Sequence, residues 1–314
     1  MNTLYKSNSA PIEMGATWFH PQHRNLISLL EELGVTYFEQ HKDNTVFYQK
    51  SDIHPTQIVQ VPEQPPSYRI YGGTSNLLNQ LFERLDKNSV LMNQPVTRIN
   101  SYESTIQIVA RETFEATTVV LALPPKLWAN KIMFQPALPD ALLRIAESTH
   151  TWMEDSIKIG LSYDQPFWQQ DKIPATLYSN SGPITELYDH SNAEKSSYAL
   201  CGFMNPSLKT LSYIDRRERV TKQLKTVFGE KALAFTNYEE CIWSTEEHTG
   251  FDTSNFLYPH QNNGNAIFKS TLFNDKLLIS SSESASEFPG YMDGAVYAGN
   301  AVAEKLIKSV KKTP

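Results

Sequence analysis

The residues best placed to do chemistry lie where the apolar segment "LLI" (277–279) runs into a cluster of hydroxyl groups. After it the sequence "FPGYMDGAVYAGNAVAEKL" (288–306) breaks at a Pro-Gly pair, exposes Tyr291 and opens an amphipathic helix at Asp293. Free N–H groups and the positive end of a helix dipole at such a start favour an electron-rich ligand group. Composition alone also fits an ordinary strand–turn–helix unit, so both interpretations stay open here.

Two further segments carry residues with chemical potential. Lys158 lies on the polar side of the strictly alternating segment "SIKIGLSY" (156–163). It is either a solvated surface charge or a desolvated amine able to hold or activate a water. In "EMGATWFHPQH" (13–23) the small residues allow a close approach of backbone to a ligand, and Trp18 adds aromatic surface.

The elements that must position these residues begin with two predicted helices, 23–34 and 72–85, each with apolar residues at helical spacing. Segment 39–69 is polar and proline-marked, which favours a connection or a short strand pair rather than a core element. Segment 117–123, "TTVVLAL", is continuously apolar and is expected to be buried on both faces. From about residue 150 alternating strands surround one amphipathic helix at 216–229.

Composition and missing motifs exclude several classes of protein. The 314 residues carry a formal net charge of -6, which argues against a nucleic-acid or anionic-membrane surface. No apolar run approaches the roughly 18 residues of a membrane span. Two cysteines, Cys201 and Cys241, favour a reduced, cytoplasmic protein. No glycines are spaced i, i+2, so the chain has no G-x-G-x-x-G turn, and it has no hydrolase or kinase motif. His20 and His23 lack a third ligand, so cap or surface roles are expected and no metal site.

Six stretches together resemble the flavin-containing amine oxidase family, the monoamine and polyamine oxidases and their short bacterial relatives. They cover nearly the whole chain in the order of the family. The stretches are "EMGATWFHPQHRNLISLLEELGV", "YGGTSNLLNQL", "NQPVTRI", "TTVVLALPP", "SIKIGLSYDQPFW" and "SSSESASEFPGYMDGAVYAGNAVAEKL".

The resemblance assigns roles to individual residues. It implies that Lys158 holds a water against flavin N5, that Tyr291 walls a slot for the amine, and that Trp243 lies near the ring. Those three are the expected catalytic residues. The expected FAD-binding residues are Gly15, Ala16, Thr17, Trp18, Val96, Ser282, Glu283, Tyr291 and Met292.

Some family features have no match in this sequence. The cysteine that tethers flavin in some members is absent after "EEHTGF", so FAD is expected to be non-covalent. The second aromatic residue of the amine slot has Phe251 and Phe256 as possible stand-ins. The first strand and glycine-rich turn of the family are also missing. The resemblance therefore suggests that Met1 is an internal methionine, and that a separately encoded N-terminal segment is a partner.

The fold class expected from the resemblance is α/β with mixed α+β content. It combines an incomplete, Rossmann-like FAD-binding domain with a substrate domain whose antiparallel or mixed sheet is covered by helices. The FAD-binding-type domain is expected at 1–45, 68–148 and 245–314, and the substrate domain at 46–67 and 149–244.

The expected function is an FAD-dependent oxidoreductase that oxidises a small-molecule amine to an imine and passes electrons to oxygen. Two alternatives remain. One is a non-catalytic or truncated member that does not bind FAD alone, because the nucleotide turn is missing. The other is a relative of the flavin desaturases.

Overall fold

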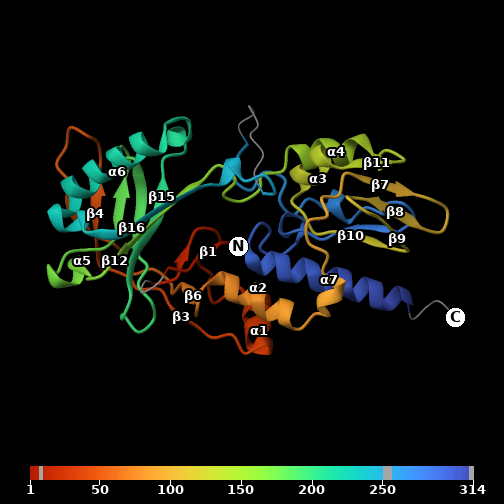
Figure 1. Cartoon of the computed structure of the whole chain (residues 1–314), viewed down its shortest axis with the longest axis horizontal. Coiled ribbons are helices and arrows are strands. Elements are labelled where there is room, and N and C mark those ends of the chain that lie inside the picture. Colours follow the sequence, from red (N-terminus) through yellow and green to blue (C-terminus); the bar gives the residue numbers. More distant parts are fainter. Residues whose placement is uncertain (7–9, 250–256, 311–314) are drawn as a thin grey trace. The chain divides into compact units, whose positions relative to one another are not determined.

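The computed structural model describes residues 1–6, 10–249 and 257–310, and the chain divides into two compact units (Figure 1). Unit 1 comprises residues 1–22, 30–82 and 155–243, and unit 2 comprises residues 23–29, 83–154 and 244–314. Each unit has its own hydrophobic core. The assignment of a cofactor domain and a substrate domain to particular ranges stays a prediction.

Unit 1 is built on a seven-stranded sheet. Neighbouring strands are antiparallel, except that β13 runs parallel to β4. The strands, in spatial order, are β16 (Phe235–Ile242), β12 (Ile157–Tyr163), β15 (Tyr198–Met204), β14 (Ile184–Asp189), β13 (Leu177–Ser179), β4 (Thr45–Gln49) and β5 (Gln57–Gln60). The prediction that segment 39–69 lies outside the core is wrong for β4. Val46 and Phe47 are buried there, because the strand joins the sheet.

One face of this sheet is covered by α6 (Tyr213–Phe228). The helix starts where the Ser212 hydroxyl accepts a hydrogen bond from the Asp215 N–H (3.1 Å). Its apolar residues, Leu224 among them, pack against alternate residues of β12. A fully buried side chain of this size contributes about 2 kcal/mol through removal of apolar area from water. The predicted sheet with a helical cover is thereby confirmed.

The opposite face of β12 is buried as well, because the N-terminal segment packs onto it. A Cβ added at Gly160 would lie 2.6 Å from Cγ2 of Ile12, so only glycine lets the two segments come this close. Lys158 and Ser162 on this face are 2% and 1% exposed. The interpretation of Lys158 as a solvated surface charge is therefore wrong.

Smaller elements complete unit 1. Two antiparallel strand pairs join β1 to β2 and β3 to β6. Their bounds, with those of the helices, are β1 (Thr3–Leu4), β2 (Ile12–Glu13), β3 (Tyr37–Glu39), β6 (Tyr68–Ile70), α1 (Arg24–Leu33, which begins in unit 2), α2 (Thr74–Glu83), α5 (Phe167–Gln170) and the 3₁₀ turns Pro206–Thr210, Glu230–Leu233 and Trp243–Thr245.

Unit 2 holds a four-stranded sheet and a separate parallel pair of strands. The sheet order is β11 (Met133–Gln135), β7 (Arg98–Ser101), β8 (Ile106–Val109) and β9 (Thr113–Ala116). The pair is β10 (Val119–Leu121) with β17 (Leu277–Ile279). The helices are α3 (Pro125–Lys131), α4 (Asp140–Glu147) and α7 (Met292–Val310), with 3₁₀ turns at Lys87–Ser89, Ala266–Lys269 and Ser282–Ser284.

The expectation that segment 117–123 is buried on both faces is wrong. Val120 at the centre of β10 is 37% exposed. Among the described strands β10 pairs with β17 alone, so the two form a narrow ribbon rather than the middle of a wide sheet.

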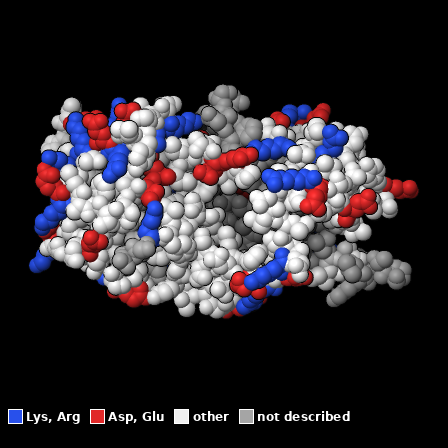
Figure 2. All heavy atoms as spheres, in the orientation of Figure 1, with Lys and Arg blue, Asp and Glu red and all other residues white. Residues whose placement is uncertain are grey.

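Acidic and basic side chains are interspersed on the face seen in Figure 2. Within the described residues, no helix combines the length and apolar character that crossing a membrane would require.

Candidate functional site

Lys158 is the centre of the site in unit 1. Its Nζ donates to the carbonyl oxygens of Glu13 (3.1 Å) and Gly15 (2.9 Å) and to the hydroxyl of Thr17. The ammonium therefore meets uncharged acceptors, and burial lowers the pKa of Lys158 from its ordinary value. A lysine held in this way can give up a proton more readily than a surface lysine.

Aromatic rings lie against this amine. Nζ of Lys158 is 5.1 Å from the ring centre of Trp18 and 5.0 Å from that of Phe203, which is its cross-strand neighbour on β15. Trp18 in turn meets Tyr188 edge to face at 5.2 Å. We call Trp18, Tyr188 and Phe203 the aromatic patch. All three are only partly buried, so the patch offers apolar surface next to Lys158.

Trp243 packs against Met14 and Gly15 of the N-terminal segment. Its Nε1 donates to the Met14 carbonyl (2.6 Å), and a Cβ at Gly15 would lie 3.2 Å from Cζ2 of its ring. The small-residue run thus allows a close approach, as predicted, but the partner seen here is an indole ring. Gly15, Thr17, Trp18, Lys158 and Trp243 are brought together, with Ala16 exposed between them.

Glu13 supports this cluster, and no pattern in the sequence signals it. Its carboxylate accepts from the Thr74 N–H (2.6 Å), the Thr74 hydroxyl (2.8 Å) and the Thr3 hydroxyl (3.0 Å). It thereby caps α2. Burial raises the pKa of Glu13, while these hydrogen bonds oppose the rise. Its backbone N–H donates to Nε2 of His190 (3.2 Å).

The second group of predicted residues lies in unit 2, at the start of α7. Asp293 in its first turn is fully buried and accepts from the Leu26 N–H (2.8 Å) and the Asn25 side chain (2.9 Å). One carboxylate therefore satisfies a free N–H of α1 and lies at the positive end of α7. Tyr291 and Met292 stand at the N-terminal end of α7 as the sequence predicts.

Glu283 lies in the turn between β17 and α7. This turn is closed where the Ser281 N–H donates to the Ser284 hydroxyl (3.0 Å). Glu283 is 2% exposed, and burial raises the pKa of its carboxyl group. Its Oε2 has no hydrogen-bond partner within the part of the chain that the structure describes. A buried acceptor of this kind suits a ligand hydroxyl.

Tyr291 sits in an aromatic cluster that sequence reasoning missed. Its ring centre is 5.6 Å from His260, 5.9 Å from Trp152 and 5.4 Å from His23, and Trp152 stacks on His260 at 4.4 Å. His23 is a cap residue, as expected: it directly precedes α1, and its carbonyl accepts from the Ile27 N–H (3.1 Å). The alternative of a surface residue is wrong, because its side chain is 3% exposed against these rings. The three partners come from separate segments, so no local pattern could group them.

The predicted residues therefore fall into two clusters, one in each unit. Gly15, Ala16, Thr17, Trp18, Lys158 and Trp243 belong to unit 1, and Ser282, Glu283, Tyr291 and Met292 belong to unit 2. Val96 is half-buried against the core of unit 2, just before β7. Phe251 and Phe256 lie outside the described residues.

The cluster in unit 2 offers groups of the kinds that suit FAD. The long helix α7 presents its N-terminus, and Glu283 contributes a buried carboxyl oxygen that has no hydrogen-bond partner among the described residues. Both cysteines are buried in sheet strands of unit 1. In the residues described, no group of three or more His, Cys, Asp or Glu side chains is placed to hold a metal ion.

Comparisons with known proteins point to one family. The family model described as flavin containing amine oxidoreductase matches residues 1–69 and 63–307. The flavin-containing amine oxidase B of Canis lupus familiaris is 25% identical over 304 residues, covering 93% of this chain and 57% of that protein. The chain thus spans little more than half the length of this curated relative.

Solved structures support the fold. Wild-type putrescine oxidase bound to putrescine aligns with a TM-score of 0.82 and 20% identity, over 98% of this chain and 90% of that one. Cyclohexylamine oxidase from Brevibacterium oxydans aligns with a TM-score of 0.83 and 16% identity over the same shares, 98% and 90%. The family match over nearly all of the sequence shows that the chain belongs to the flavin-containing amine oxidoreductases.

Proposed function

We propose that this chain acts as an FAD-dependent amine oxidase that converts an amine to an imine and passes the electrons to oxygen. The observation that carries the proposal is Lys158, a 2%-exposed amine held by backbone oxygens and Thr17 beside partly exposed aromatic rings. A bound flavin would supply the redox chemistry by accepting a hydride from the carbon next to the amine.

The chain's own residues would bind and orient the reactants. FAD would be held without a covalent bond by Gly15 to Trp18, Val96, Ser282, Glu283 and Met292. Tyr291 would contact the apolar part of the amine and keep water away from it. Lys158 would hold a water at Nζ in exchange for its bond to Thr17, and its lowered pKa suits a group that moves a proton.

Flavin uptake tests this proposal directly. Purified chain is incubated with FAD, freed of excess cofactor by gel filtration, and then mixed without oxygen with putrescine or cyclohexylamine. We expect flavin absorbance to co-elute with protein, an amine to bleach it, and air to restore it with formation of peroxide.

Two results would contradict the proposal. One is a chain that is folded by circular dichroism yet retains no flavin. The other is a flavin-loaded chain that no amine reduces. Glu283→Gln is a further test variant. It keeps the shape of the carboxyl group but removes its charge, and it is expected to weaken FAD retention without unfolding unit 2.

A further inference from the structure

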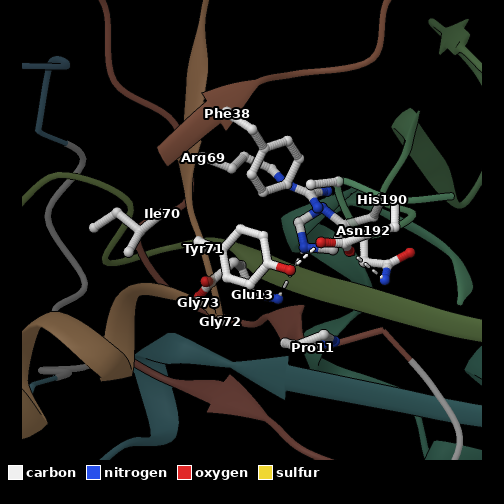
Figure 3. Close-up of a pocket in the computed structure, with 12 residues that line it drawn as sticks. Pro11, Glu13, Phe38, Arg69, Ile70, Tyr71, Gly72, Gly73, His190 and Asn192 are labelled. Carbon is white, nitrogen blue, oxygen red and sulfur yellow. Dashed lines mark hydrogen bonds between the residues drawn. The ribbon is translucent and has the colours of Figure 1, made fainter. Parts of the chain in front are cut away.

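Unit 1 contains a cavity of about 120 Å³ that the proposed redox chemistry does not use (Figure 3). It lies between the turn that follows β6 and the segment that follows β14. Its walls include Arg69, His190 and Glu13. Since a single water needs only about 15 Å³ of such space, the cavity has room for a small organic molecule.

Arg69 brings a buried cation to this wall. Its side chain is 5% exposed, its guanidinium lies 4.7 Å from the ring centre of Phe38, and its Nη2 donates to the Ser191 carbonyl (2.6 Å). Nη1 has no hydrogen-bond partner among the residues that the structure describes. Burial lowers the pKa of Arg69 to about 10, so the group is still charged at neutral pH. A buried charge with free donors calls for an anion.

His190 brings a second donor, and its protonation follows from one hydrogen bond. A backbone N–H can only donate, so Nε2 of His190 must accept from Glu13 (3.2 Å). The neutral ring then carries its proton on Nδ1. Burial, and next Arg69, lower the pKa of His190 well below its ordinary value, which agrees with a neutral ring. Nδ1 is buried and finds no partner in the described part of the chain.

The entrance of the cavity carries a carboxylate, whereas the wall formed by Arg69 and His190 offers hydrogen-bond donors. The Tyr71 hydroxyl and the Asn192 amide (2.8 Å) both donate to the carboxylate of Glu194. Figure 3 shows the side chains of Tyr71 and Asn192 near those of Arg69 and His190. An exposed carboxylate at this place disfavours a ligand with two negative charges. The Glu13 carboxylate on the wall is already satisfied by Thr3 and Thr74.

We propose that this cavity is a binding site for a small monocarboxylate, with one carboxylate oxygen accepting from Nη1 of Arg69 and the other from Nδ1–H of His190. Water could satisfy the donors but could not neutralise the guanidinium. Phe38 and Ile70 supply apolar wall for a short carbon chain. The site is independent of flavin and of the proposed amine chemistry.

Acetate is the probe that tests the site. Titration of the purified chain with acetate at constant ionic strength, with chloride as the balancing anion, is followed by calorimetry. The Nδ1–H resonance of His190 is followed in ¹⁵N-histidine-labelled protein. We expect saturable binding of acetate, a shift of that resonance with the same midpoint, and weaker binding of sulfate.

Variants separate the site from general anion effects. Arg69→Gln should raise the dissociation constant of acetate about 10-fold or more, because a charge-assisted hydrogen bond is lost. Arg219→Gln removes an exposed arginine of α6 and should leave it unchanged. Ala193→Leu fills the cavity without touching its charges and should abolish binding even if Arg69→Gln fails to fold. Absence of saturable binding, unchanged binding in Ala193→Leu, or tighter binding of sulfate than of acetate would overturn the proposal.

Discussion

At the scale of single residues, Lys158 and Glu13 are joined by a hydrogen bond and are best considered together. The ammonium of Lys158 is held by two backbone carbonyls and a hydroxyl, and one of those carbonyls belongs to Glu13. The Glu13 carboxylate meanwhile binds Thr74 and Thr3, and no carboxylate among the described residues forms an ion pair with the lysine. This arrangement separates the two charges, and it keeps the pKa of Lys158 low through burial.

Replacing this amine should impair the proposed reaction at its oxygen step. In Lys158→Met the side chain keeps its length but has no proton to move and no donor for a water. We expect the return of electrons to oxygen to slow by about 100-fold or more, the range found for loss of proton-transfer catalysis. Stopped-flow reoxidation of the amine-reduced protein measures this rate. Lys195→Met, at an exposed position, is the control, and equal rates in the two variants would contradict the assigned role.

His190 should make stability depend on pH. Its pKa is lowered on folding, so below a pH of about 6.5 the unfolded chain takes up a proton that the folded chain resists. The free energy of unfolding should therefore fall with decreasing pH, by up to about 1.4 kcal/mol per pH unit from this one group.

Urea unfolding of the wild type and of His190→Gln, measured at several values between about pH 5 and 8, checks this dependence. The variant should lose this part of the slope, whereas His54→Gln, at an exposed position, should keep it. Parallel curves for the wild type and His190→Gln would show that another group is responsible.

At the scale of elements, the start of α7 depends on a contact with a distant helix. The buried carboxylate of Asp293 joins α7 to the N-terminus of α1 through Leu26 and Asn25. Asp293→Ala should lower the free energy of unfolding by about 2–3 kcal/mol, because it leaves a buried N–H unsatisfied. Asp293→Asn keeps an acceptor and should cost less. Thermal or urea unfolding measures both, and equal losses would mean that the hydrogen bonds are not the cause.

Periodicity predicts α1, α2, α6 and α7 but not the shorter helices α3 to α5, and it does not predict burial. The helix expected at 23–34 is α1, and the helix expected after the Pro-Gly pair is α7. The alternation in 156–163 correctly predicts β12 but leaves open whether its polar face is solvated or buried. That face is buried by a segment about 145 residues away in sequence, as the hydrogen bond from Lys158 to Glu13 shows. Such a partner leaves no mark on the local pattern.

The same limit applies to the site residues, because contacts with segments distant in sequence leave no local signal. Those predicted from the family resemblance form two clusters, yet His190 and Trp152 were missed. Trp152 lies in a turn and His190 directly follows β14, and neither has a spacing that signals chemistry. His190 is identified only by the hydrogen bond from Glu13, and Trp152 only by its stacking on His260.

At the scale of the whole molecule, the division into two units has an energetic consequence. Leu224 and Leu142 are fully buried in the cores of unit 1 and unit 2. Each Leu→Ala change should cost about 2–5 kcal/mol and act on its own unit. Hydrogen exchange read by mass spectrometry should show faster exchange of β12 in Leu224→Ala and of the β7–β8 pair in Leu142→Ala. Faster exchange of both regions in both variants would show that the chain unfolds as one body.

The last strand of the seven-stranded sheet bears on how this protein behaves at high concentration. β5 is mostly exposed, with Ile58 56% exposed, and its outer edge offers backbone groups for pairing with another chain. Pro55 and Pro62 stand on either side of this four-residue strand, and a proline cannot donate to a growing ladder. A four-residue edge between two prolines is therefore a poor template for adding a strand from another chain.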